Sequence, residues 1–194
     1  MKVSPLAAFR SAALILLVLA GLGLHWLSPF PRRDLAPPLI PLRAEIRTPN
    51  RFEVQGPNQC GGYATAFVLR HLGREASGAD IYRRLGRKLP FSGYVLPGGI
   101  TRLLEREGFR PALYRGTLRS LKAHVAKGRP PIVLVGDSVD WQHYITLVGY
   151  NTPKRALYFY DSNYAHDANG PLPGNRTLTE KEFLSLWNNG LPGF

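Results

Sequence analysis

Four residues of this chain have the types and the order that acyl chemistry at a carbonyl carbon requires: Gln55, Cys60, His143 and Asp161. A thiolate can attack the carbonyl if an imidazole within hydrogen-bonding distance takes the thiol proton. A third group must orient the imidazole, and fixed donors must stabilise the oxygen that becomes negative. The four side chains are useful only if the fold brings them together.

Cys60 is the only cysteine, so the chain has no internal disulfide and no Cys-rich zinc site. Gly56 and Pro57 predict a turn before it, and residues 64–72 predict a helix that ends at Gly73. Cys60 therefore lies at or within one residue of a helix N-terminus, where unpaired N–H groups favour a thiolate. The alternative is that Cys60 is a small buried apolar residue, as most free cysteines are.

The five histidines differ in how well they suit a cysteine partner. His25 lies in an apolar run, and His71 lies about 16 Å along the helix axis from the cysteine. We expect His124 to be solvated on a helix among lysines, and nothing fixes His166 in its Gly- and Asn-rich loop. His143 begins a predicted strand, where the scaffold can hold a side chain rigidly. It is therefore the predicted imidazole partner.

Strand geometry indicates Asp161 as the orienting group. A hairpin of strands 143–150 and 156–162, with its turn centred on Pro153, places Asp161 opposite Ile145 and diagonal to His143. The apolar residues that share this face favour the register: Ile145, Leu147, Leu157 and Phe159. Asp161 could instead belong to a turn that ends the strand, and Asp137 and Asp140 are rivals in the loop before His143.

An oxyanion needs preorganised donors, and two groups near the cysteine can supply them. One is the backbone N–H of Cys60 itself. The other is the side chain of Gln55, which the turn at residues 56–57 carries back over the thiol. Gln59 is nearer in sequence, but an adjacent side chain tends to point away, so Gln55 is the favoured donor.

The elements that must position these residues indicate an α+β domain. Helices are predicted at 64–72, 78–85, 100–107, 118–127 and 179–187, and a fully buried strand at 132–135 precedes the 143–162 hairpin. A further strand is predicted at 109–114. Helices that precede an antiparallel sheet are typical of the α+β class.

The N-terminal quarter has a different composition from the rest of the chain. Residues 1–10 carry positive charge, and residues 11–28 form an apolar run that predicts a transmembrane signal anchor rather than a cleaved signal peptide. Residues 29–45 are a Pro-rich segment, expected to act as a semi-rigid spacer. The folded domain is then 46–194, and we expect it outside the cytoplasm, or secreted if the apolar segment is cleaved.

The net charge of +12 and the pI of about 10.3 come mostly from arginines spread along the chain. Because they form no dense basic run, we expect no nucleic-acid partner. Attraction to an anionic lipid or an acidic cell-wall polymer is the expected consequence. An arginine-rich composition without any such partner is the alternative.

At several segments the chain resembles the papain-like cysteine peptidases, and most closely the C39-like group related to bacteriocin-processing peptidases. The matching segments are Gln55, Cys60-Gly61-Gly62 with Ala64 and Ala66, Lys127–Val135, His143–Gly149 and Tyr160–Asn163. The chain departs from the group at Gly62, where Pro is frequent, and in a Gln-to-Cys spacing that is one residue shorter. The resemblance implies a papain-like fold, with the cysteine helix packed on a C-terminal antiparallel sheet. It also implies a Cys–His–Asp triad with a glutamine in the oxyanion hole.

Together these features predict a membrane-anchored thiol peptidase that acts on peptides or proteins without a cofactor or a metal. An amidase or acyltransferase with the same triad is an alternative. A catalytically inactive papain-like module that binds an envelope component is another.

Overall fold

An antiparallel sheet of five strands forms the centre of the domain in the computed structural model, which describes residues 5–35, 37, 39–48, 50–137, 141–164 and 173–188. The strands are β2 (Arg43–Glu45), β4 (Ile132–Gly136), β5 (Gln142–Asn151), β6 (Ala156–Tyr160) and β7 (Arg176–Thr179). The long strand β5 is central: β6 pairs with one edge, and β2 and β4 pair with different parts of the other. β7 pairs with β6 and completes the sheet.

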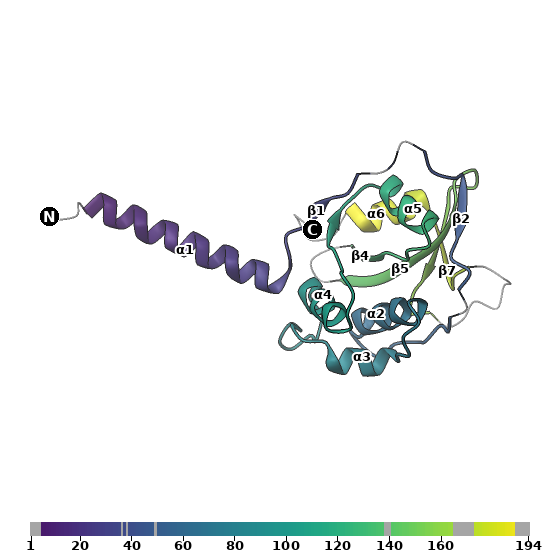
Figure 1. Ribbon diagram of the computed structural model, residues 1–194, viewed down its shortest axis with the longest axis horizontal. Helices are drawn as coiled ribbons and strands as arrows, with labels where there is room; N and C mark the ends of the chain where they lie inside the picture. The colour runs from purple at the N-terminus through teal and green to yellow at the C-terminus, as the bar shows by residue number, and fades with distance from the viewer. Residues whose placement is uncertain are drawn as a thin grey trace.

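Helices cover both faces of this sheet (Figure 1). On one side lie α2 (Cys60–His71), α3 (Gly78–Arg84) and α4 (Pro97–Arg106), and on the other lie α5 (Leu118–Ala126) and α6 (Glu180–Asn188). Side chains of β4 alternate between the two cores: Ile132 and Leu134 pack toward α2, whereas Val133 and Val135 pack toward α5 and α6. The fold is therefore α+β, as predicted, but β4 is not the fully buried strand that its composition suggested.

The β5–β6 hairpin has the predicted register near the site and a shifted register near its turn. Leu147 lies opposite Phe159 and Thr146 opposite Tyr160, and continuing this pairing puts Asp161 opposite Ile145. Between residues 147 and 149 the strand contains a bulge, so the pairs that lie nearer the turn are out of the predicted register by one residue. The apolar residues of the predicted shared face do lie in one core: Ile145, Leu147, Leu157 and Phe159.

Several element boundaries differ from the predictions. Helix α2 begins at Cys60, four residues earlier than residues 64–72 suggested, because the turn at residues 56–59 leads directly into it. The strand predicted at 109–114 is only β3 (Tyr114–Arg115), which pairs with β1 (Arg32–Arg33). Strands β2 and β7 were not predicted, since each is short and gains its order from pairing with a neighbour.

The Pro-rich segment lies against the domain and is not a free spacer. Besides the β1–β3 pairing, the backbone N–H of Thr152 donates to the carbonyl of Leu42, and β2 belongs to the sheet although it precedes residue 46. The expectation that His124 is solvated is wrong, because its Nε2 lies 3.0 Å from Oδ2 of Asp34. The segment is thus attached at several points, by backbone pairing and by the hydrogen bond between His124 and Asp34.

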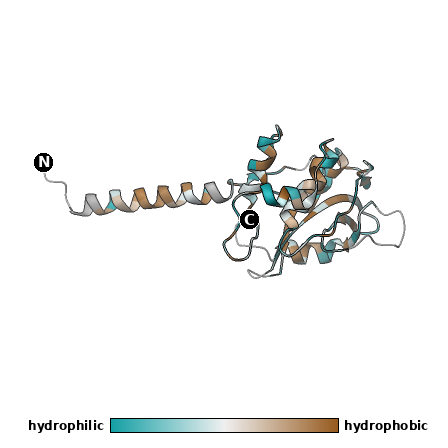
Figure 2. Ribbon diagram, turned by 90° about the horizontal axis from the view of Figure 1, so that it is seen from below, coloured by the Kyte–Doolittle hydropathy of each residue, from teal (hydrophilic) through white to brown (hydrophobic). Residues whose placement is uncertain are grey.

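The predicted apolar run lies in helix α1 (Pro5–Leu27), which projects from the domain (Figures 1 and 2). The apolar side chains of α1 from Phe9 to Leu24 are largely exposed. Within the described ranges, no helix combines the length and the apolar character needed to cross a membrane. The transmembrane anchor stays a prediction from the sequence. The extracytoplasmic location stays a prediction from the sequence.

Candidate active site

Cys60 is the first residue of α2, and a tight turn presents it there. The N–H of Gln59 donates to the carbonyl of Gly56, and Asn58 adopts a left-handed conformation with φ 59°. The Asn58 side chain donates to the carbonyl of Ser92, which fixes the turn against the loop before α4. The first amides of a helix have no carbonyl partner within it, so the Cys60 N–H is a candidate donor to a substrate oxygen.

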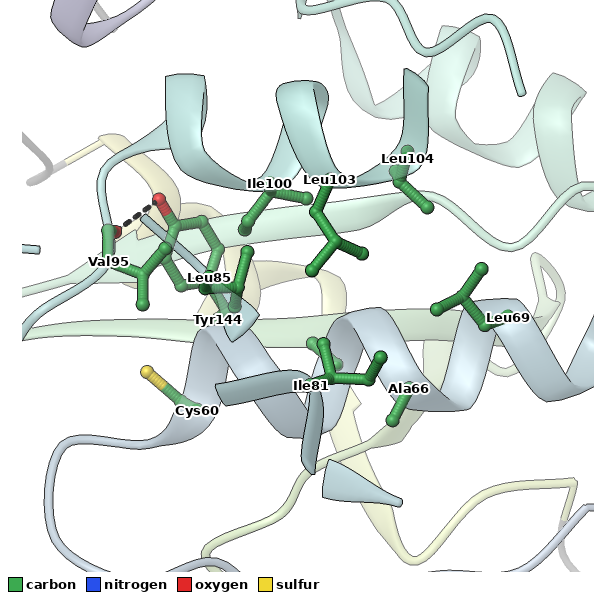
Figure 3. Packing of buried hydrophobic residues seen from close by; sticks show 11 residues of the cluster. Cys60, Ala66, Leu69, Ile81, Leu85, Val95, Ile100, Leu103, Leu104 and Tyr144 are labelled. Carbon is green, nitrogen blue, oxygen red and sulfur yellow. Dashed lines mark hydrogen bonds between the residues drawn. The ribbon is translucent and has the colours of Figure 1, made fainter. Parts of the chain in front are cut away.

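The Cys60 side chain is almost completely buried, with 3% exposure. It packs at the edge of an apolar cluster that includes Val95, Ile100 and Tyr144, at the first turn of α2 (Figure 3). The alternative interpretation, a small buried apolar residue, thus describes its packing correctly. However, Cys60 also lines a pocket together with His143 and interacts with its imidazole, which a simple filler residue would not do.

His143 and Asp161 are joined by a short hydrogen bond in a buried environment. Nε2 of His143 lies 2.7 Å from Oδ1 of Asp161, and both side chains are at most 3% exposed. Because Nε2 is bonded to Asp161, Nδ1 is the ring nitrogen that can interact with the thiol of Cys60. Burial by itself lowers the pKa of His143, but the hydrogen bonds and charges of Asp161 and Cys60 outweigh it and raise the pKa to about 9. The imidazole is therefore stabilised in its protonated form by these two partners.

The Asp161 carboxylate is held from several directions. Its Oδ1 also accepts the backbone N–H of Asn163 at 3.0 Å, and its Oδ2 accepts Arg176 Nη1 at 2.5 Å. Asn175 bonds both the N–H and the carbonyl of Asp161 through its side chain. Burial raises the pKa of Asp161, but the bonds from His143, Asn163 and Arg176 outweigh it and lower the pKa below its ordinary value.

Gln55 lies beside this group and is also fixed. Its N–H donates to the carbonyl of Ser162, and the Ser162 hydroxyl donates to Gln55 Oε1 at 2.6 Å. Because Oε1 is occupied, the amide nitrogen of Gln55 is the end that can donate to a substrate oxygen. Gln59, the rival donor, folds its side chain over Gly56 and does not line the pocket.

A pocket of about 430 Å³ opens over Cys60 and His143. Its lining comprises Gln55, Gly56, Pro57, Asn58, Cys60, Tyr94, Trp141, Gln142, His143 and Asn163. The Trp141 ring lies 5.8 Å from the His143 ring, centroid to centroid, and contributes to covering it. Most other lining side chains carry amides or a hydroxyl, which suit the N–H and C=O groups of a peptide backbone.

Of the predicted site residues, the structure thus brings together Gln55, Cys60, His143 and Asp161. Their catalytic roles stay predictions. The other histidines in the described ranges lie elsewhere: His25 is on α1, and His71 contacts the carbonyl of Gly128. His166 and the rival aspartate Asp140 lie outside the described residues. The other rival, Asp137, does not line the pocket.

Sequence reasoning missed several residues that build the site. Asn58, Tyr94 and Trp141 line the pocket, and Asn175 and Arg176 hold Asp161. Only Trp141, two residues before His143, carried a signal, since alternate strand residues share a face. Among the described residues, no group of three or more His, Cys, Asp or Glu side chains could hold a metal ion.

Comparison with known proteins indicates the family and the fold of the chain. Residues 43–189 match the model of the Peptidase_C39 like family. No curated protein sequence matches the chain. The fold is similar to a crystal structure named as a C39-like peptidase from Bacillus anthracis, with a TM-score of 0.54 and 14% identity over 75% of this chain and 92% of that one. Because the family model matches about three quarters of its length, the chain belongs to the Peptidase_C39 like family.

Proposed function

We propose that this chain is a cysteine peptidase that hydrolyses peptide bonds with Cys60 as the nucleophile. His143 acts as the base and then as the acid, and Asp161 orients its ring. Gln55 and the N–H of Cys60 stabilise the oxyanion. The observation that carries the proposal is the position of His143, which hydrogen-bonds to Asp161, interacts with Cys60 and lines the same open pocket as Cys60.

In the first half of the reaction, the Cys60 thiol gives its proton to His143 and its sulfur attacks the carbonyl carbon of the scissile bond. The carbonyl oxygen becomes negative and accepts hydrogen bonds from the Gln55 amide and the Cys60 N–H. The tetrahedral intermediate then collapses, and the C–N bond breaks. His143 returns its proton to the leaving amine, so a thioester between Cys60 and the acyl half remains.

In the second half, water enters where the amine has left. His143, now neutral, takes a proton from the water, and the resulting hydroxide attacks the thioester carbon. The same two donors stabilise the second oxyanion. The C–S bond breaks, the acid product leaves, and His143 returns the proton to the sulfur.

Turnover of internally quenched fluorescent peptides, with products identified by mass spectrometry, tests the proposal. Cys60→Ala should abolish cleavage, and His143→Ala should lower kcat by at least about 100-fold. His71→Gln is the matched control, because it changes another histidine of the domain that lies outside the pocket. Cleavage by the Cys60→Ala protein at the wild-type rate would exclude the mechanism.

The rate of Cys60 alkylation by iodoacetamide is a second measurement that needs no substrate. Near neutral pH the thiol should react faster in the wild type than in His143→Ala by about tenfold or more, because the imidazole stabilises the thiolate. Equal rates in both proteins would favour a binding module without catalysis. Transfer of the acyl group to an added amine in place of water would instead indicate the amidase or acyltransferase alternative.

A further inference from the structure

The Asp161 carboxylate has two cationic partners, and only one of them belongs to the proposed triad. Oδ1 accepts from His143 Nε2 at 2.7 Å and from the N–H of Asn163 at 3.0 Å. Oδ2 accepts from Arg176 Nη1 at 2.5 Å. The two oxygens are thus divided between the imidazole and the guanidinium, and Asp161 lies between them.

The chain before β7 is built so that Arg176 reaches this position. Gly174 lies so close to β6 that an added Cβ would be 2.2 Å from the carbonyl oxygen of Phe159. The next residue, Asn175, bonds the Asp161 backbone, and Arg176 then pairs with Phe159 as the first residue of β7. The Arg176 guanidinium also lies 4.9 Å from the centre of the Tyr164 ring. The backbone contacts of residues 174–176 fix the strand, and the contacts with Asp161 and Tyr164 then restrict where the guanidinium can lie.

A buried carboxylate that faced a single imidazole would hold it strongly as the imidazolium. Asp161 is fully buried, and its charge is one of the contributions that raise the pKa of His143. Yet the proposed reaction requires His143 to release its proton to the leaving amine. A second cation on the same carboxylate reduces the negative field at the imidazole and makes that release easier.

We propose that Arg176 is a positioning residue of the reaction: it holds Oδ2 of Asp161 and offsets part of its charge, so that Asp161 orients the His143 ring without trapping the imidazolium. This inference rests on the proposed peptidase function for its kinetic consequence. Its effect on His143 can be measured without any substrate.

The other charged and titratable groups around the pair are few among the described residues. Cys60 faces His143 from α2, and Arg176 faces Asp161 from β7. The Tyr164 ring stacks on Arg176, and Glu182 of α6 interacts electrostatically with it. Because the Arg176 side chain is 18% exposed, water can replace the guanidinium at Oδ2 when the side chain is shortened, so Asp161 stays ionised.

The test is an NMR pH titration of the His143 imidazole in the full chain, with its signal assigned from its loss in His143→Gln. In the wild type we expect a midpoint at about 9. Arg176→Gln should move the midpoint upward by about one pH unit, and Arg176→Lys, which keeps the charge, should leave it near the wild-type value. Arg110→Gln is the control, because it removes the charge of an exposed arginine outside the pocket.

A midpoint that is unchanged or lower in Arg176→Gln would overturn the proposal and leave Arg176 with a structural role, visible only as a lower Tm. If this variant does not fold, Arg176→Ala with and without added methylguanidinium replaces it, and the cation should bring the midpoint back toward 9. With a cleaved peptide, kcat should fall about 3-fold to 10-fold and KM should not change. If the wild type cleaves nothing, the peptidase proposal fails, while the titration still decides the role of Arg176.

Discussion

The stability of the folded domain should depend on pH through His143, and the size of the effect can be calculated. In the folded protein the pKa of His143 is about 9, against an ordinary value of 6.5. Its side chain is 3% exposed, so solvent hardly screens the interactions that cause this. A difference of about 2.5 pH units corresponds to about 3 kcal/mol of folding free energy.

The direction follows from which state binds the proton more tightly. Because the folded pKa lies above the unfolded one, the folded state holds the proton over a wider pH range. The contribution is fully present below about pH 6.5, decreases as the pH rises, and is lost once the pH passes about 9. Through His143, the free energy of unfolding of the wild type should therefore fall by about 3 kcal/mol between these two pH values.

Urea unfolding followed by circular dichroism, repeated at several pH values from 6 to 10, measures the loss. His143→Gln is the comparison, because it keeps a polar side chain that cannot take the proton and leaves every other titratable residue in the chain. The difference between the two proteins should shrink by about 3 kcal/mol across the window. If the unfolding free energies of the two proteins changed with pH in parallel, the pKa of His143 would not be raised in the folded state. The buried His143–Asp161 bond would then contribute no pH-dependent stability.

Three further changes test other parts of the site. Gln55→Ala should lower kcat by roughly 100-fold to 1000-fold with little change in KM, if the amide stabilises the oxyanion; steady-state kinetics on a cleaved peptide would reveal an unchanged kcat if it does not. Asp161→Asn should cost about 3–5 kcal/mol of unfolding free energy, since Arg176 loses its buried anionic partner; a smaller loss in urea unfolding would indicate that the pair is weak. Gly174→Ala should cost about 1–3 kcal/mol through its clash with Phe159, and scanning calorimetry that finds an unchanged Tm would contradict this close approach.

Local patterns predicted the hairpin well because its geometry depends on near neighbours in the sequence. The alternation predicted that His143 and Asp161 lie on paired strands; β6 in fact ends at Tyr160, but the register beyond the bulge is the predicted one and places Asp161 next to the paired residues. The bulge itself was not predicted. It absorbs one residue near the turn without changing the pairing at the site, so the prediction of the His143–Asp161 contact did not depend on it.

The residues that hold the triad could not be predicted in the same way. Arg176 lies in a short strand that has order only through its pairing with β6, and the sequence around it carries no periodic signal. Ser162 was part of the strand-end motif, but its bond to Gln55 joins segments that are distant in sequence. Such contacts depend on how whole elements pack, and no local preference encodes them.

By itself, the sequence determined which side chains could do chemistry, that Cys60 lies at a helix start, and that His143 and Asp161 belong to one hairpin, although Asp161 lies one residue past the end of β6. The tertiary structure decided that the start of α2 meets β5, that Gln55 and not Gln59 turns into the pocket, and that Arg176 occupies the far side of Asp161. The physical reason is the sequence separation over which the determining interactions act. Turns, helices and hairpins are set by backbone preferences over a few residues, whereas the site forms only when burial of two cores fixes the helices on the two faces of the sheet.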